Sequence, residues 1–193
     1  GMKVGEAPED ENTSPEAIRI QLRRSLVRMR TDYVDVYYLH RYDPDTEPHA
    51  VARAMGEELR AGTIRAWGVS NYTAAQLAAL LAAAADEGVP APALCQPALS
   101  MLNTGALEEL LPLCEKEGVG VVPYQLLQGG MLTGKYRRGQ EAPAGSRLAE
   151  KPEWMKPFTD ETYDVIERCA AEAAAEGVTM TQHALRWALA QPG

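Results

Sequence analysis

The chain has 193 residues, of which 46% are hydrophobic, so it can bury a sizeable core, although a closed eight-stranded β/α barrel typically needs about 250. Its formal net charge of -8 repels phosphate backbones and anionic lipids, which argues against nucleic acid or a membrane surface as the main partner. The three cysteines form no C-x-x-C pair, the three histidines have no metal-ligand spacing, and no secretory or membrane-spanning run is found, so we expect a cytoplasmic protein without a metal.

The first predicted helix begins at Pro15. Ser14 offers a side-chain oxygen for the N-cap, the ring of Pro15 is preset to helical φ, and Glu16 places an acid at the positive end of the helix dipole. Residues 33–39 are nearly all apolar and rich in β-branched and aromatic types, which predicts a strand buried on both faces. His40 follows directly at the end of this strand.

The next two units repeat the same order of helix and strand. A helix is predicted to end at Gly62, and residues 64–69 form the following strand. Thr73 with Gln76 makes a capping box for an alanine-rich helix, after which residues 93–96 form a short strand.

The fourth unit has a helix that ends at Gly118 and a strand at residues 120–124. Strand, helix and strand at intervals of about 30 residues is the βαβ spacing, which predicts a parallel sheet. After the polar segment 137–157, Thr159 and Thr179 each predict the start of one more helix.

Doubly wound sheets show the same alternation, so the strand ends have to distinguish the two folds. No G-x-G-x-x-G follows any predicted strand, as a dinucleotide-binding doubly wound sheet would require. Polar residues do recur just after strand ends, at His40, Ser70, Asn71, Gln96 and Gln125. In a barrel these ends form one face, which carries the chemistry, so we expect a barrel.

Several segments agree in order and spacing: residues 31–40 (TDYVDVYYLH), 68–71 (GVSN), Gln96 and 130–136 (GMLTGKY). Together they resemble the aldo-keto reductases, over nearly the whole chain from about Ser14 to the end. Residues 40–45 (HRYDPD) look most like the branch that includes bacterial oxidoreductases and the potassium-channel β subunits.

The resemblance implies a (β/α)8 barrel, the cofactor NADPH and the reduction of aldehydes or ketones. The expected fold is α/β, a partial (β/α)8 TIM barrel that contains parallel strands four to seven with their helices. Residues 1–193 would then form a single incomplete aldo-keto reductase barrel domain, truncated at both ends. The expected partner is a small-molecule carbonyl substrate, with a homo-oligomer as a further option.

The family's catalytic tetrad is Asp, Tyr, Lys and His, and the resemblance places the Asp and Tyr in the first barrel units, before this chain. His40 would orient the carbonyl beside the nicotinamide; the alternative is a polar residue that caps a strand end. Lys3 resembles the tetrad lysine at the end of the third strand; the alternative is an exposed N-terminal lysine without a catalytic role. The isolated chain is therefore expected to be inactive.

Three residues match those that hydrogen-bond the nicotinamide carboxamide in the family: Ser70, Asn71 and Gln96. Hydroxyl and amide side chains supply the donors and acceptors that an amide ligand needs. Turn chemistry is the alternative for the Ser-Asn pair. It explains Gln96 less well, because a lone amide at the end of a buried strand is costly without a partner.

Tyr124 matches the aromatic residue that stacks on the nicotinamide ring, with a core aromatic as the alternative. Gln125 and Leu126 replace the family's usual Ser-Pro in the backbone cradle for the pyrophosphate, whereas Leu127 and Gly129 keep its pattern.

Lys135 and Arg147 would neutralise the cofactor phosphates, and simple solvation of two loop cations is the alternative. Residues 129–135 also fit the spacing G-x-x-x-x-G-K of a P-loop. Tyr136 stands where a P-loop needs Ser or Thr for magnesium, so we exclude an NTPase.

Two other functions stay open beside carbonyl reduction. One is a redox-sensing regulatory subunit that binds the cofactor without required turnover, as channel β subunits do; His40 argues against it, because that branch can lack the histidine. The other is a non-catalytic fragment.

Overall fold

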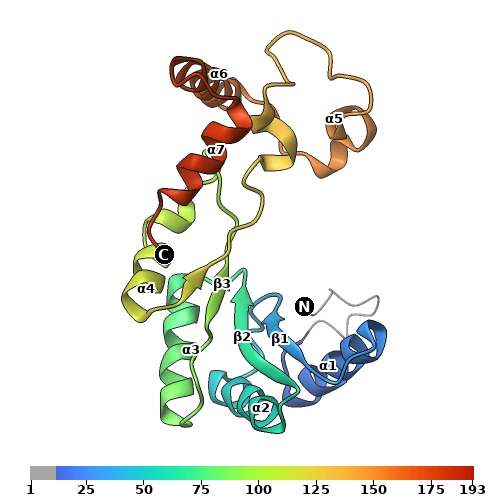
Figure 1. Ribbon diagram of the computed structural model, residues 1–193, viewed down its shortest axis with the longest axis vertical. Coiled ribbons are helices and arrows are strands. Elements are labelled where there is room, and N and C mark those ends of the chain that lie inside the picture. The colour runs from blue at the N-terminus through green and yellow to red at the C-terminus, as the bar shows by residue number, and fades with distance from the viewer. Residues whose placement is uncertain (1–11) are drawn as a thin grey trace. The chain divides into compact units, whose positions relative to one another are not determined.

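A computed structural model of the chain describes residues 12–193, which fall into two compact units (Figure 1). The first unit contains the described residues up to Pro97, together with Glu109–Val122 and Gly193. The second contains Ala98–Glu108 and Pro123–Pro192. Lys3 lies outside the described residues.

The first unit is built on one four-stranded parallel sheet whose strands follow each other in sequence order. The strands are β1 (Val34–Leu39), β2 (Ile64–Ser70), β3 (Leu94–Gln96) and β4 (Gly120–Val121). The predicted parallel sheet is thereby confirmed, and the carboxyl ends of these strands lie at one edge.

Four helices accompany this sheet: α1 (Pro15–Met29), α2 (Pro48–Ala61), α3 (Ala74–Asp86) and α4 (Leu110–Glu117). Their ends follow the local signals of the sequence. Ser14 Oγ accepts a hydrogen bond from the backbone N–H of Ala17, and Thr73 and Gln76 form both bonds of a capping box. Gly62 and Gly118 end α2 and α4 in the left-handed conformation that glycine adopts without steric cost.

The two faces of β1 are covered to different extents. Tyr37 and Leu39 are 2% and 0% exposed, on the face that the helices cover, whereas Val36 and Tyr38 on the other face are only half-buried within the described chain. The strand was expected to be buried on both faces, and within the described chain one face of β1 is buried and the other is half-buried. In a barrel the second face lines the interior.

Large and small residues alternate across that interior face, where Tyr38 pairs with Gly68 and Leu94 pairs with Gly120. A Cβ on Gly68 would lie 2.6 Å from Leu94 O and 2.8 Å from Tyr38 Cε1, so only glycine leaves room for the tyrosine ring. Tyr38, Gly68 and Leu94 come two residues before His40, Ser70 and Gln96 along the strands. This layer of side chains therefore lies next to the strand ends that carry His40 and Gln96.

The predicted strand at residues 120–124 is shorter in the structure. Pro123 has no N–H to donate to a ladder, and the regular pairing of β4 stops at Val121. Tyr124, in the second unit, forms an isolated parallel bridge with Ala98, and its carbonyl accepts a hydrogen bond from Leu99 N at 3.1 Å.

The second unit is helical. Its elements are η2 (Gly105–Leu107), η3 (Gln128–Thr133), α5 (Arg147–Glu150), η4 (Pro152–Trp154), α6 (Asp160–Ala175) and α7 (Met180–Leu189). Thr159 and Thr179 cap α6 and α7 as predicted. Met131 and Leu132 of η3 pack with Ile166, Cys169 and Ala184 in a buried cluster, so η3 is anchored on the helix pair.

The described residues contain neither a membrane-spanning helix nor a group of metal ligands. None of their helices has the length and apolar character needed to cross a membrane. Within the same part of the chain, no three His, Cys, Asp or Glu side chains are grouped so that they could hold a metal ion.

Candidate functional site

The ends of β1, β2 and β3 bring four of the predicted site residues together: His40, Ser70, Asn71 and Gln96. The Asn71 amide nitrogen donates to the His40 carbonyl oxygen at 2.8 Å, and the Ser70 hydroxyl donates to the Gln96 carbonyl oxygen at 2.9 Å. These two side chains therefore join three neighbouring strand ends into one rigid edge.

Ser70 and Asn71 thus do part of the turn chemistry that the alternative interpretation expects. Ser70 is 3% exposed, and its oxygen also accepts a hydrogen bond from Asn71 Nδ2 at 3.1 Å. Asn71 has φ of 59°, in the left-handed region that asparagine tolerates better than most residues. A role toward a ligand for these two residues would add to this structural one.

Two polar groups at the same edge have no partner within residues 12–193. His40 Nδ1 is buried and accepts or donates no hydrogen bond there. The half-buried Gln96 uses its backbone carbonyl for Ser70 and for the Asn71 N–H, while its side-chain amide makes no hydrogen bond in the described chain. An unmet buried polar atom such as His40 Nδ1 costs about 1–3 kcal/mol, so a ligand that pairs with it would recover that energy; the half-buried Gln96 amide is accessible to a ligand.

A second group of predicted residues lies in the second unit, around a left-handed turn. Gln125, Gln128, Gly129 and Gly130 have φ of 61°, 46°, 67° and 97°. Gly129 has a positive φ at which a side chain would be strained, and a Cβ there would also lie 2.8 Å from Met155 Sδ.

Lys135 and Arg147 both reach this pair of glycines. A Cβ on Gly130 would lie 2.8 Å from Lys135 Cε and Nζ, and one on Gly129 would lie 3.8 Å from Arg147 Cδ. Two exposed cations beside backbone in successive left-handed conformations suit an anionic group such as a phosphate.

The remaining predicted residues of the second unit have mixed surroundings. Tyr124 and Leu126 are half-buried. Leu127 packs on the buried cluster, and its carbonyl accepts hydrogen bonds from Gly130 N at 2.8 Å and Leu132 N at 3.3 Å, so it supports the turn.

Asp43 is a site residue that the sequence interpretation missed. It is 7% exposed and accepts hydrogen bonds from Thr13 N at 2.8 Å, Thr46 Oγ1 at 2.7 Å and Asp45 N at 3.0 Å. Burial alone would raise the pKa of Asp43, but these hydrogen bonds hold the pKa below its usual value. The available signal was an aspartate with a threonine three residues later, which is typical of a side-chain-capped turn.

The loop after His40 is therefore fixed by an ionised carboxylate. A second contact supports it, since the rings of Tyr42 and Tyr72 meet edge to face with centroids 5.5 Å apart.

Comparisons with known proteins identify the family of the chain. The family model described as the Aldo/keto reductase family matches residues 1–193. A probable voltage-gated potassium channel subunit beta of Oryza sativa subsp. japonica is 33% identical over 192 residues, which cover 97% of this chain and 58% of that protein. An NADH-specific methylglyoxal reductase of Escherichia coli (strain K12) is 33% identical over 192 residues, 98% of this chain and 56% of that protein.

Among solved structures, a glycerol dehydrogenase from Gluconobacter oxydans matches with a TM-score of 0.77 and 28% identity, over 94% of this chain and 54% of that one. The chain belongs to the aldo-keto reductase family, and its parallel sheet with helices is a part of the (β/α)8 barrel of that family. The chain spans a little over half the length of the curated relatives it matches. Family members are oxidoreductases that generally bind a nicotinamide cofactor and act on small carbonyl substrates.

Proposed function

We propose that the protein containing this chain reduces aldehydes and ketones to alcohols with NADPH. The observation that carries the proposal is the pair of unpartnered polar groups at one strand edge, His40 Nδ1 and the Gln96 amide, within residues 12–193. An imidazole after β1 and an amide at the end of β3, at the same edge of the sheet, supply the hydrogen-bonding groups that a carbonyl and a nicotinamide carboxamide need.

Each residue of the first unit has a distinct role in this proposal. When bound, the cofactor supplies the hydride that a carbonyl carbon receives. Gln96, with Ser70 and Asn71, holds the nicotinamide carboxamide, and His40 orients the carbonyl by a hydrogen bond to its oxygen, which polarises the C=O bond. Lys3 stays the candidate for the tetrad lysine.

The predicted residues of the second unit have proposed roles of their own toward the cofactor. Tyr124 would stack on the nicotinamide ring, and the backbone of residues 125–129 with Lys135 and Arg147 would hold the phosphates. The fit of these residues to a phosphate rests on Gly129 and Gly130, because the side chains of Lys135 and Arg147 lie close to the positions that a Cβ on these glycines would occupy.

NADPH rather than NADH follows from the family resemblance alone, and the NADH-specific relative makes NADH the direct competitor. Titration of the complete protein with each cofactor, followed by the fluorescence of the bound nicotinamide, distinguishes them. We expect a lower dissociation constant for NADPH; equal or reversed constants would contradict this choice.

By the resemblance to the family, the proton of the proposed reaction would come from a tyrosine of an earlier barrel unit. A positioned general acid typically contributes about 10² to 10⁴ in rate, so we propose that residues 1–193 alone, as a single incomplete barrel domain, do not turn over. A reducing cytoplasm suits the three free buried cysteines, Cys95, Cys114 and Cys169.

The second candidate is a regulatory subunit that senses the redox state of a bound cofactor. Relatives named as potassium channel β subunits favour it. Binding of NADPH by the complete protein without any reduction of a panel of small aromatic and dicarbonyl aldehydes would decide for this candidate, whereas turnover decides for the reductase.

Gln96→Ala tests the observation on which the proposal rests. We expect cofactor binding to weaken by about 1–3 kcal/mol, the cost of leaving a buried polar partner unmet. Gln140→Ala is the control, because Gln140 is exposed and its side chain makes no hydrogen bond within the described residues. Equal dissociation constants for Gln96→Ala and its parent would make Gln96 a structural residue only.

A further inference from the structure

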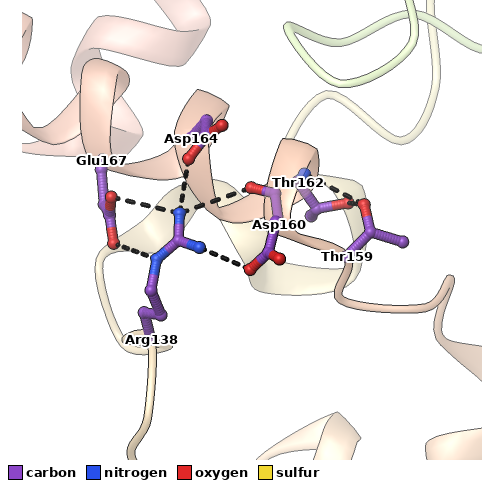
Figure 2. Close-up of polar contacts among 6 residues, drawn as sticks. All are labelled: Arg138, Thr159, Asp160, Thr162, Asp164 and Glu167. Carbon is purple, nitrogen blue, oxygen red and sulfur yellow. Dashed lines mark hydrogen bonds and ion pairs between the residues drawn. The ribbon is translucent and has the colours of Figure 1, made fainter.

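Arg138 lies three residues after Lys135 and contacts three carboxylates on one helix (Figure 2). Its three nitrogens are 2.6 Å from Asp160 Oδ1, 2.5 Å from Asp164 Oδ1 and 3.0 Å from Glu167 Oε1. The guanidinium carbon also lies 5.3 Å from the ring centroid of Tyr163. One side chain thus ties the segment after the glycine pair to α6.

The three carboxylates lie on one face of α6, because their spacing of four and three residues matches the helical repeat. An arginine can contact all three at once, since its planar guanidinium carries five N–H donors. A lysine or a neutral side chain could not replace this contact. Without Arg138, three like charges would face each other on the helix.

The segment packs on its surroundings through Tyr136, which is 3% exposed and meets Phe158 with ring centroids 5.2 Å apart. A cavity of about 540 Å³ lies along the segment, and its lining includes Tyr136, Arg138, Tyr163, Ile166 and Met180. The segment's own anchor is Tyr136, whose hydroxyl accepts a hydrogen bond from Leu148 N at 3.2 Å. The ion pairs of Arg138 therefore join the segment to α6 where apolar contact is incomplete.

The same segment carries both cations of the proposed phosphate site. Lys135 lies against Gly130 and Arg147 against Gly129, at the two ends of the stretch that Arg138 attaches to α6. If the ion pairs of Arg138 were lost, the positions of Lys135 and Arg147 would change with that of the short segment between them.

We propose that Arg138 is a positioning residue: its ion pairs with α6 hold the segment from Gly134 to Arg147 in place, so that Lys135 and Arg147 stay at the glycine pair and retain the bound cofactor. The part about retention rests on the proposed function. The attachment itself does not depend on it.

Hydrogen exchange of the complete protein without cofactor tests the attachment. We expect Arg138→Gln to speed exchange of the amides in residues 134–151 about three- to ten-fold, since exposed ion pairs are individually weak but these share one side chain. Arg137→Gln is the matched control: it removes the same charge one residue earlier, and Arg137 is exposed and forms no ion pair within the described residues. Unchanged exchange in Arg138→Gln overturns the proposal.

The helix side offers an independent variant. Asp164→Asn with Glu167→Gln removes two of the three pairs without touching the segment, and it should reproduce the faster exchange of residues 134–151. About 1 M salt should bring the parent toward the same rate, because screening shortens to about 3 Å, and it should leave Arg138→Gln unchanged. Faster exchange in Arg138→Gln but not in the helix variant would show that the ion pairs are not the cause, and would overturn the proposal.

Dissociation of NADPH, followed by stopped-flow fluorescence, tests the retention. Arg138→Gln should release NADPH about three- to ten-fold faster than its parent and Arg137→Gln. Faster exchange with unchanged release overturns the link to the cofactor. If the parent binds neither NADPH nor NADH, the proposed function fails, while the exchange experiment still decides the attachment.

Discussion

Asn71 Nδ2 donates a hydrogen bond of 2.8 Å to the backbone carbonyl oxygen of His40 and so joins the end of β2 to the end of β1. A residue proposed to bind the cofactor thereby also fixes the residue proposed to orient the carbonyl. The two functions of this edge are coupled through one amide.

We expect Asn71→Ala to weaken cofactor binding by about 1–3 kcal/mol and to lower kcat as well, because His40 loses its backbone partner. Asn71→Gly distinguishes the effect of losing the amide from the effect of backbone strain, since glycine adopts the φ of 59° without strain. Both variants should show the same loss in fluorescence titration and in steady-state rates. If Asn71→Gly behaves like the parent, backbone strain and not the amide explains the effect.

His40→Ala should lower kcat by about 10² or more and leave the cofactor dissociation constant nearly unchanged, because His40 faces the carbonyl in the proposed arrangement. His49→Ala is the control, since His49 is exposed on α2 and pairs with Asp86 at 3.3 Å. An unchanged kcat in His40→Ala would refute the role given to His40.

Gly130→Ala should weaken cofactor binding about ten-fold, because its Cβ would meet Lys135 Nζ at 2.8 Å and displace the cation. Gly139→Ala also places a Cβ at a positive φ, 71° against 97° at Gly130, but that Cβ meets nothing within 4 Å. Isothermal titration of both variants with NADPH compares them. Equal losses would attribute the effect to the backbone rather than to Lys135.

Asp43 makes the stability of the His40 loop depend on pH. Because its folded pKa is lowered, the carboxylate stabilises the fold above the unfolded pKa of about 3.9, and this contribution is lost as the pH falls through the folded pKa. Asp43→Asn should reduce the free energy of unfolding by about 1–3 kcal/mol at pH 7. Denaturant melts from pH 7 to pH 3 should show this difference shrink below about pH 4; the exposed neighbour Asp45→Asn serves as the control. A difference that is constant with pH would exclude the carboxylate as its cause.

A polypeptide of residues 1–193 alone should associate. Among the strands that the structure describes, β1 and β4 are the sheet edges, and Asp35, paired with Arg65 at 2.9 Å, is the single charged residue on them. Unpaired apolar edges and a half-buried interior face favour contact between copies. Light scattering should report oligomers or aggregates, and an NADPH-consumption assay no turnover; a dispersed, active monomer would contradict both expectations.

The sequence predicted the helix ends well because capping is local. Ser14, Thr73 and Thr179 each bond to an N–H within three residues, so the signal and its effect lie in one short stretch. The strand at residues 120–124 is shorter than its apolar pattern predicts, because Pro123 has no N–H for the ladder and regular pairing stops at Val121.

The contacts that shape the candidate site could not be predicted in the same way. Asn71 and His40 are 31 residues apart, and Arg138 reaches Glu167 across 29 residues. Composition and spacing identify such residue types but not their partners, which depend on strand register and helix packing. The motif residues were identifiable, whereas the hydrogen bonds that already engage Ser70 and Asn71 were not.

Transfer of deuterium tests the central claim most directly. The complete protein is incubated with NADPH deuterated at the transferable position of nicotinamide C4 and a small aromatic aldehyde, and the alcohol is analysed by mass spectrometry. If the protein is a carbonyl reductase, deuterium appears on the carbinol carbon, with the yield reduced in His40→Ala and in Gln96→Ala. Bound NADPH with no deuterated alcohol from any aldehyde tested would contradict the claim and leave the regulatory subunit as the better account.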